Sequence, residues 1–246
     1  MKRKDSSIVV ITGASRGLGK ALALTFASHG LHVIVNYLQA KEAADKVVAL
    51  IQEKGGTASP FRADVRDRNE LSRMYERAIN EWGRLDILIN NAGVIADSKI
   101  RNMTEEEWES VISVNLTGTV HAIQSILPYM LKQGHGHILN IASYAGIHGR
   151  MGQANYTASK AGVMALTKTA ARELGPHNIR VNTILPGLLN VGMGARLSPA
   201  QQAKIQKESV LPTLPQLHQV TEFIYTLALM EGVSGQIFNL DSRILY

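Results

Sequence analysis

The sequence contains no cysteine, which excludes disulfide bonds, thiolate metal sites and cysteine nucleophiles. It also lacks any apolar run long enough to cross a membrane. Residues 1–13 are basic, but their apolar stretch is short and leads into a glycine turn, unlike the long apolar region of a signal peptide. We therefore expect a cytoplasmic protein with no membrane partner.

Positive charge is in mild excess only. The 246 residues carry a net charge of +6, with 45% hydrophobic and 19% charged residues, a composition typical of a globular protein. A basic surface could attract acidic partners, or it could be an ordinary solvated surface. The basic residues are scattered and accompany no helix-turn-helix or RNA-binding signature, so we expect no nucleic-acid partner.

Strand-like and helix-like patterns alternate along the chain. Nearly continuous apolar runs, typical of parallel strands buried on both faces, occupy residues 6–13, 31–37, 85–91, 136–143 and 179–187. Helical patterns occupy residues 41–54, 71–82, 104–132 and 155–174. This alternation predicts an α/β fold with an open, doubly wound parallel sheet, in a single domain over residues 1–246.

Residues 188–214 interrupt the alternation, because glycines and prolines surround one short helical stretch there. An irregular segment after the carboxyl end of a strand is where an α/β sheet places a substrate lid. The segment could equally be a surface excursion, and its own sequence does not decide between the two.

The first predicted strand ends in a glycine-rich turn, T-G-A-S-R-G-L-G at residues 12–19. Gly13, Gly17 and Gly19 let the backbone approach a ligand, and the helix that follows offers its N-terminal N–H groups to a phosphate. A glycine trio after a strand and before a helix therefore indicates a dinucleotide site, against the alternative of a merely tight turn.

The choice between NAD and NADP depends on two places in the sequence. The second strand ends at Asn36 and Tyr37, and no carboxylate follows before Glu42 to bind the ribose hydroxyls and repel a 2′-phosphate. Arg16, inside the turn, could pair with that phosphate or be a solvated turn residue. We expect NADP(H).

Tyr156 precedes Lys160 by four residues in a predicted helix, so the two side chains lie on one face. A free phenol has a pKa of about 10, and a nearby lysine charge favours its ionised form. Reduction of a carbonyl builds negative charge on its oxygen, which a tyrosine can protonate at short range. The pair alone indicates either packing on an amphipathic helix or a proton-transfer site.

Seven motifs occur in an order and spacing typical of one family. They are T-G-A-S-R-G-L-G at 12–19, A-D-V at 63–65, N-N-A-G at 90–93, Asn115, Ser143, Y-T-A-S-K at 156–160 and P-G at 186–187. The serine precedes the tyrosine by 156 − 143 = 13 residues. Over essentially its full length the sequence resembles the short-chain dehydrogenase/reductase family, which implies a Rossmann fold.

The resemblance implies a catalytic set of Asn115, Ser143, Tyr156 and Lys160. Tyr156 is the expected proton donor, and Ser143 would donate a hydrogen bond to the substrate carbonyl. Lys160 would hold positive charge near the phenolate and, as the family implies, bind the nicotinamide ribose. Asparagine is a poor residue inside a helix, which suggests a role for Asn115 elsewhere; in the family it positions a water that links Lys160 to solvent.

Cofactor contacts are expected from several strand ends. The expected set is Gly13, Ser15, Arg16, Gly17, Leu18, Gly19, Asn36, Tyr37, Asp64, Val65, Asn91, Ala92, Gly93, Tyr156, Lys160, Pro186, Gly187 and Leu189. The resemblance implies that Asp64 and Val65 contact the adenine and that residues 91–93 line the middle of the cofactor.

Three features depart from the family pattern. Members commonly carry a threonine four residues after the P-G glycine, where this chain has Val191. Members often end in D-G-G, where this chain reads Asp241, Ser242 and Arg243, and residues 211–220 lack the usual glycine and acidic cluster. These departures bear on substrate identity and subunit packing rather than on the reaction type.

Within the family, the sequence resembles the 3-oxoacyl-acyl-carrier-protein reductases, which implies NADPH-dependent reduction of the 3-keto group of an acyl thioester. An acidic acyl carrier protein is a candidate partner for Arg172 and Lys132, which we expect near the edge of the active site, although Pro128 replaces a basic residue common in these reductases. The alternatives are a dehydrogenase of another secondary alcohol or ketone, such as a sugar, polyol or steroid, and a non-catalytic cofactor-binding regulator.

The remaining expectations concern assembly and metals. The resemblance implies a homotetramer, although the unusual C-terminus makes a dimer an alternative. His135 and His137 form an H-x-H pair, but no cysteine or nearby carboxylate accompanies them in the sequence, so we interpret them as part of an exposed turn and expect no metal site.

Overall fold

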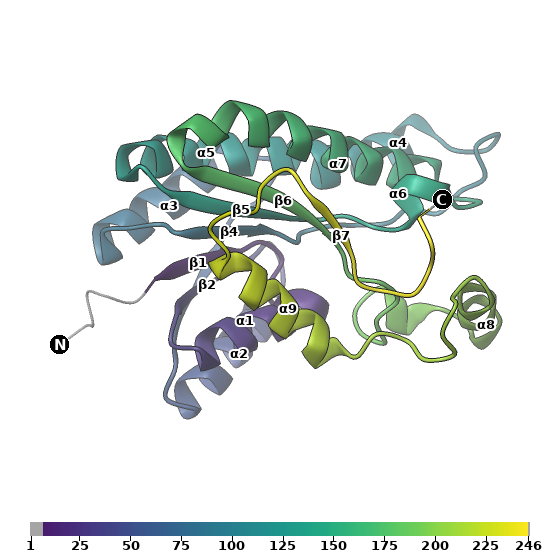
Figure 1. Cartoon of the computed structure of the whole chain (residues 1–246), viewed down its shortest axis with the longest axis horizontal. Helices are drawn as coiled ribbons and strands as arrows, with labels where there is room; N and C mark the ends of the chain where they lie inside the picture. The colour runs from purple at the N-terminus through teal and green to yellow at the C-terminus, as the bar shows by residue number, and fades with distance from the viewer. Residues whose placement is uncertain (1–6, 246) are drawn as a thin grey trace.

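Parallel strands alternate with helices along the chain (Figure 1), and this computed structural model describes residues 7–245. The strands are β1 (Ile8–Ile11), β2 (His32–Tyr37), β3 (Thr57–Arg62), β4 (Ile87–Asn90), β5 (Gly136–Ile141), β6 (Ile179–Leu185) and β7 (Ile237–Asn239). They form one seven-stranded sheet in the order β3-β2-β1-β4-β5-β6-β7, and every neighbouring pair is parallel. The predicted doubly wound parallel sheet is confirmed.

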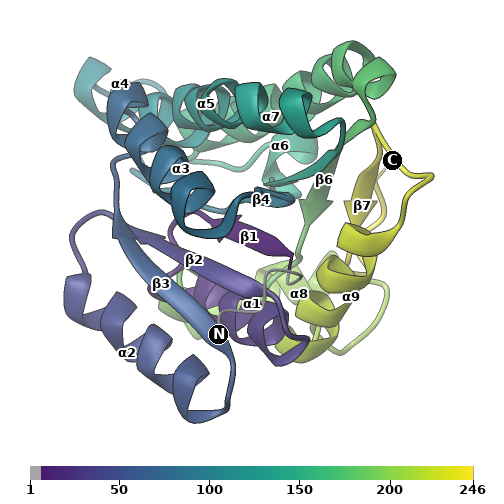
Figure 2. The same ribbon diagram turned by 90° about the vertical axis from the view of Figure 1, so that its left-hand side faces the viewer.

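Helices cover both faces of this sheet (Figure 2). One face packs against α1 (Gly17–Ser28), α2 (Lys41–Glu53) and α9 (Leu217–Leu229), and the other against α3 (Arg68–Trp82), α4 (Glu105–Ile112), α5 (Gly118–Gln133) and α7 (Ala154–Leu174). Because side chains alternate along a strand, Val9 and Ile11 of β1 join the apolar cluster on one face. Ile8 and Val10 join the cluster on the other face.

Two strands fall outside the sequence expectation. β3 contains Pro60, which lacks an N–H, and a sheet tolerates proline at its edge because half of the backbone groups there need no strand partner. β7 has three half-buried residues, too few for a recognisable apolar run. The helix expected over 104–132 is interrupted by a π-helical turn, Ser113–Thr117, between α4 and α5.

The strand order reverses between β1 and β4, and a doubly wound sheet places its binding crevice at such a point, outside the carboxyl ends of the strands. The glycine turn, residues 91–93, Ser143 and Pro186 all follow strands that end at this edge. Residues 188–214 begin at the same edge and contain a 3-10 turn (Gly194–Arg196) and α8 (Pro199–Lys207). Within residues 7–245, none of the helices is both long enough and apolar enough to cross a membrane.

Candidate active site

The glycine-rich turn joins β1 to α1 and packs closely on the end of β4. Gly13 has a φ of +63°, a region that L side chains rarely adopt, and a Cβ on it would lie 3.0 Å from the Cα of Ala92. A Cβ on Gly19 would lie 2.5 Å from the Nδ2 of Asn91. The Thr12 hydroxyl accepts hydrogen bonds of 3.0 Å from the N–H groups of Asn91 and Ala92. A larger residue than glycine therefore does not fit at either position.

The rest of the turn faces outward at the start of α1. Arg16 is the exposed N-cap residue, Ser15 and Gly17 are half-buried, and Leu18 packs against the apolar cluster beneath. The first turn of α1 contains no acidic side chain. Its N–H groups and the helix dipole therefore favour an anion, as a cofactor phosphate requires.

The Asn36 side chain supports this turn from inside the protein. Its Oδ1 accepts a hydrogen bond from the Gly13 N–H (3.2 Å), and its Nδ2 donates to the Ala63 carbonyl (3.0 Å). Asn36 and Tyr37 are both buried. The amide of Asn36 thus shapes the phosphate turn, and the expected contact between its side chain and a cofactor stays a prediction.

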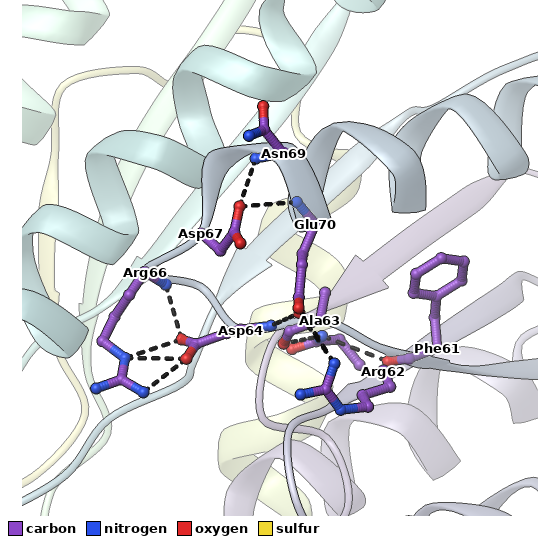
Figure 3. A network of polar contacts seen from close by, with 9 residues as sticks. Phe61, Arg62, Ala63, Asp64, Arg66, Asp67, Asn69 and Glu70 are labelled. Carbon is purple, nitrogen blue, oxygen red and sulfur yellow. Dashed lines mark hydrogen bonds and ion pairs between the residues drawn. The ribbon is translucent and has the colours of Figure 1, made fainter.

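Asp64 lies in a network of charged groups between β3 and α3 (Figure 3). Its carboxylate accepts hydrogen bonds from the Arg66 guanidinium at 2.6 to 3.0 Å, and this hydrogen bonding holds the pKa of Asp64 below its usual value. The Asp64 N–H donates to Glu70, which also pairs with Arg62 at 3.2 Å. The buried Val65 side chain belongs to the apolar cluster that includes Ala122 and Ile123 of α5.

Asn115 lies in the π-helical turn, at the position where the sequence shows a poor helix former. Its Oδ1 accepts a hydrogen bond from the Val94 N–H (2.9 Å), and its Nδ2 donates to the Val94 carbonyl (3.0 Å) and to Ser159 Oγ (3.2 Å). The side chain therefore fastens the segment after β4 to α7. The local distortion of the helix accompanies this role, as π-turns commonly do at functional sites.

Lys160 projects from α7 into the protein and is 4% exposed. Its Nζ donates a 2.8 Å hydrogen bond to the Ile141 carbonyl at the end of β5. A Cβ on Gly93 would lie 3.8 Å from this Nζ, so the small residue leaves space above the ammonium. Burial lowers the pKa of Lys160 from 10.5 to about 8, because a charged amine loses hydration there.

Tyr156 lies one helical turn before Lys160, whose Nζ is 5.8 Å from the centre of the phenol ring. Burial raises the pKa of the Tyr156 phenol, and a hydrogen bond with the Ser143 hydroxyl lowers it in part. The Ser143 Oγ also accepts a 3.2 Å hydrogen bond from the Ala145 N–H. The structure thus brings the three expected groups together from the end of β5 and one face of α7.

The other wall of the crevice follows β6. Pro186 and Gly187 are half-buried, and Gly187 has a φ of +76°. The Leu189 side chain is buried in the cluster with α1 and α9, and Val191 packs against that cluster. A cofactor contact at Leu189 would therefore come from its backbone, and Val191 has no side-chain group that can donate a hydrogen bond.

Sequence reasoning missed Asn155, which is fully buried beside Tyr156. Its Nδ2 donates to the Ala96 and Glu107 carbonyls, each at 2.9 Å, and its Oδ1 accepts a hydrogen bond from the Tyr156 N–H. Asn155 therefore holds the start of α7 against Ala96 and against Glu107 of α4. The available signal was a polar amide directly before the tyrosine, within a motif otherwise made of small residues.

The interpretation of the H-x-H pair as an exposed turn is wrong for His137. His137 belongs to β5 and is 1% exposed. Its two ring nitrogens form hydrogen bonds with the Ala228 carbonyl (3.1 Å) and the Asn182 amide (3.0 Å), so the buried ring is satisfied. His135 is partly exposed and pairs with Asp86 at 3.0 Å. No cluster of three or more His, Asp or Glu side chains suited to a metal ion occurs among residues 7–245.

The expectation that Arg172 and Lys132 lie near the edge of the active site is also wrong for the active site of their own chain. Both lie at the carboxyl ends of helices that run antiparallel to the strands, so they lie at the opposite edge of the sheet from Ser143. Arg172 follows Tyr156 by 172 − 156 = 16 residues in α7, which corresponds to about 24 Å along the helix.

A comparison with protein families identifies the family to which the chain belongs, in agreement with the motifs and the geometry of the site. Residues 7–202 match the family model described as short chain dehydrogenase. The chain belongs to the short-chain dehydrogenases. It is therefore an oxidoreductase that acts between a hydroxyl and a carbonyl group, and its family binds a nicotinamide cofactor.

Named relatives of this short-chain dehydrogenase cover nearly the whole chain. A 3-oxoacyl-(acyl-carrier-protein) reductase FabG of Staphylococcus aureus is 42% identical over 246 residues, 98% of each chain. The protein of the same name from Thermotoga maritima is 38% identical over 245 residues, 99% of each chain. A 3-oxoacyl-(acyl-carrier-protein) reductase of Synechocystis sp. is 38% identical over 248 residues.

The residues present fit a dinucleotide cofactor. Because Gly13 and Gly19 have no side chain, the turn packs directly against residues 91–92. Gly93 likewise leaves free the space next to the Lys160 ammonium that a Cβ would occupy. The turn and the first N–H groups of α1 would hold the phosphates, whereas Lys160 lies where a ribose could accept its hydrogen bond.

Proposed function

We propose that this short-chain dehydrogenase is an NADPH-dependent reductase of the 3-keto group of an acyl thioester. Ser143, Tyr156 and Lys160 lie close together at the carboxyl edge of the sheet, and this arrangement is the main support for the proposal. The names of the relatives support the substrate class, since each acts on a 3-oxoacyl group bound to an acyl carrier protein.

In the proposed reaction, a proton moves from the Tyr156 phenol to the carbonyl oxygen of the substrate. The bound nicotinamide supplies the hydride for the carbonyl carbon. Burial raises the pKa of Tyr156, so its phenol is protonated at neutral pH and donates its proton to the carbonyl oxygen. Ser143 donates a hydrogen bond to the same oxygen, and Lys160 stabilises the phenolate that remains. The water expected between Asn115 and Lys160 stays a prediction.

The preference for NADPH is a separate part of the proposal. β2 ends without an acid, and Arg16 is exposed at the start of α1, where it can pair with a 2′-phosphate. Arg16→Ala should weaken NADPH binding about tenfold or more, because a charge-assisted hydrogen bond is lost, and should leave NADH binding unchanged. Fluorescence titration of both coenzymes measures this. An unchanged ratio of the two dissociation constants would refute the assignment.

Residues 188–214 are proposed to be the substrate lid, because they begin just after Pro186, which follows β6 at the edge of the crevice. Lys99, Arg101 and Arg150 replace Arg172 and Lys132 as the basic residues proposed to meet an acyl carrier. Lys99 and Arg101 are exposed, and their segment joins the start of α7 through the Ser98 N–H bond to Gly152 (2.8 Å). Positive groups at the entrance favour an acidic carrier.

Tyr156→Phe tests the reductase assignment. With acetoacetyl-CoA as substrate, the decrease in NADPH absorbance should slow by about 100-fold or more, because general acid catalysis contributes at least that factor. Tyr129→Phe, a half-exposed tyrosine on α5, is the matched control and should keep the wild-type rate. Equal rates for wild type and Tyr156→Phe would remove Tyr156 as the proton donor.

Two alternatives remain distinguishable by the same assay. Turnover of a sugar, polyol or steroid ketone in place of the thioester would favour another NADP-linked dehydrogenase. Tight NADPH binding without turnover of any carbonyl would favour a cofactor-binding regulator. The sequence feature that suggests this alternative is Val191, which stands where the family commonly has a threonine. The intact set of Ser143, Tyr156 and Lys160 favours the reductase.

We also propose a homotetramer. Phe223, Leu229 and Met230 are exposed apolar residues on and after α9, and they offer a surface for subunit contact. Light scattering of the purified protein distinguishes the tetramer from a dimer. The cytoplasmic location stays a prediction.

A further inference from the structure

Residues 241–245 contact both walls of the crevice. Asp241, Ser242 and Arg243 follow β7 where the family often has D-G-G, so two side chains are present that glycine lacks. Leu245 packs against the apolar cluster that contains Ala142, which fixes the end of the segment. Residues 241–244 are named here the C-terminal latch.

On one side, the C-terminal latch bonds the lid. The Ser242 carbonyl accepts a hydrogen bond from the Val210 N–H (3.2 Å), and the Ser242 hydroxyl accepts one from the Leu211 N–H (3.1 Å). Asp241 lies against the turn where the lid begins, since a Cβ on Gly187 would be 2.7 Å from the Asp241 Cβ. The latch therefore contacts the lid near both of its ends.

On the other side, the C-terminal latch contacts the strand end that carries Ser143. The Arg243 guanidinium lies 4.2 Å from the centre of the Tyr144 ring, a cation–π distance. The Arg243 Nε also donates to Asp241 Oδ2 at 2.9 Å, and both side chains are largely buried. The Tyr144 hydroxyl donates to the Ile244 carbonyl at 3.0 Å. Tyr144 directly follows Ser143, so the latch spans the crevice from the lid to the proposed hydrogen-bond donor.

We propose that the C-terminal latch holds the lid against the strand end of Ser143, and that Ser242 and Arg243 are positioning residues for the 3-keto substrate. The inference rests on the proposed function, because the lid is the proposed substrate wall. A lid ordered before binding lowers the conformational cost of closing on the substrate. The proposed reacting groups lie just after β5 and on α7, so the latch acts on substrate binding and leaves proton transfer unchanged.

Ser242→Ala and Ser242→Thr form the first test, because only the second keeps the hydroxyl. In Ser242→Ala, exchange of the Leu211 amide should be about tenfold faster, whereas the Val210 amide keeps its backbone acceptor and its rate. The KM for acetoacetyl-CoA should rise about three- to tenfold with kcat within about twofold. Ser242→Thr should restore both values.

Arg243→Gly and Arg243→Lys form the second test. Trypsin should cut the lid faster in Arg243→Gly at the exposed Lys204 and Lys207 of α8, and Arg243→Lys should recover part of the protection. Unchanged exchange at Leu211 together with unchanged cleavage would overturn the latch. An unchanged KM despite a freed Leu211 amide would overturn its positioning role. Should the wild type fail to reduce the thioester, the proposed function alone fails, because exchange and cleavage still decide the latch.

Discussion

Replacement of Lys160 by methionine should abolish reduction and yet stabilise the protein at neutral pH. Lys160 is buried, and its folded pKa of about 8 lies below the unfolded value of 10.5. The difference of about 2.5 units corresponds to about 3 kcal/mol at 1.36 kcal/mol per unit. The methionine variant would lose the 2.8 Å hydrogen bond to the Ile141 carbonyl, worth about 1 kcal/mol. The free energy of unfolding should therefore rise by about 2 kcal/mol at pH 7.

The sign of this effect follows from proton binding. Between pH 8 and pH 10.5 the unfolded chain holds the lysine proton and the folded chain does not, so wild-type stability rises with pH across that window. Below pH 8 both states hold the proton, and the full cost of the buried charge is present. The advantage of Lys160→Met should therefore be largest at pH 7 and should disappear as the pH approaches 10.5.

Urea unfolding of the cofactor-free protein at pH 7 and pH 10 measures both expectations. Lys46→Met, at an exposed position on α2, is the matched control and should show no gain that depends on pH. A Lys160→Met protein less stable than wild type at pH 7 would refute the reasoning. So would a gain that stays constant between the two pH values.

Two further substitutions test buried polar side chains, one beside the site and one near the opposite edge of the sheet. Asn115→Ala should lower the free energy of unfolding by about 2 kcal/mol in urea titrations, because the N–H and C=O of Val94 lose their partners; a loss below about 0.5 kcal/mol would show that water replaces the amide. Burial lowers the pKa of His137 from 6.5 to about 3, so wild-type stability should fall as the pH drops from 6.5 to 3, where the unfolded state binds the proton. His137→Gln should lose less stability over that range in acid titrations, and an identical pH profile would contradict the assignment.

The central strands could be predicted because burial on both faces leaves a continuous apolar run. β1, β2, β4, β5 and β6 have such runs, and the motifs locate the groups at their ends. The edge strands could not be predicted this way, since β3 contains a proline and β7 is short. His137 was misjudged because its partners, Ala228 and Asn182, lie at least 45 residues away in the sequence.

Local sequence indicates the side chains that are proposed to react, but not the contacts that hold them. The spacing of Tyr156 and Lys160 within α7 is a property of one helix, and any helix of this sequence would reproduce it. The Ile141 carbonyl that receives the Lys160 ammonium belongs to another element, and that pairing depends on how α7 packs on β5. The position of Arg172 was predicted wrongly for a related reason, because it depends on the length of α7 and on the direction in which that helix runs across the sheet.

Buried asparagine amides stabilise the backbone around the groups that are proposed to react. Asn36, Asn115 and Asn155 each offer a donor and an acceptor, and each bridges backbone N–H and C=O groups left without strand partners at the carboxyl edge. Aspartate would lose the donor there, and leucine would lose both functions, so neither could satisfy these backbone groups. Lys160 contributes no such stability, since its buried charge costs free energy at neutral pH. The protein therefore stabilises the backbone around the crevice with amides and tolerates one destabilising ammonium where the proposed chemistry needs a charge.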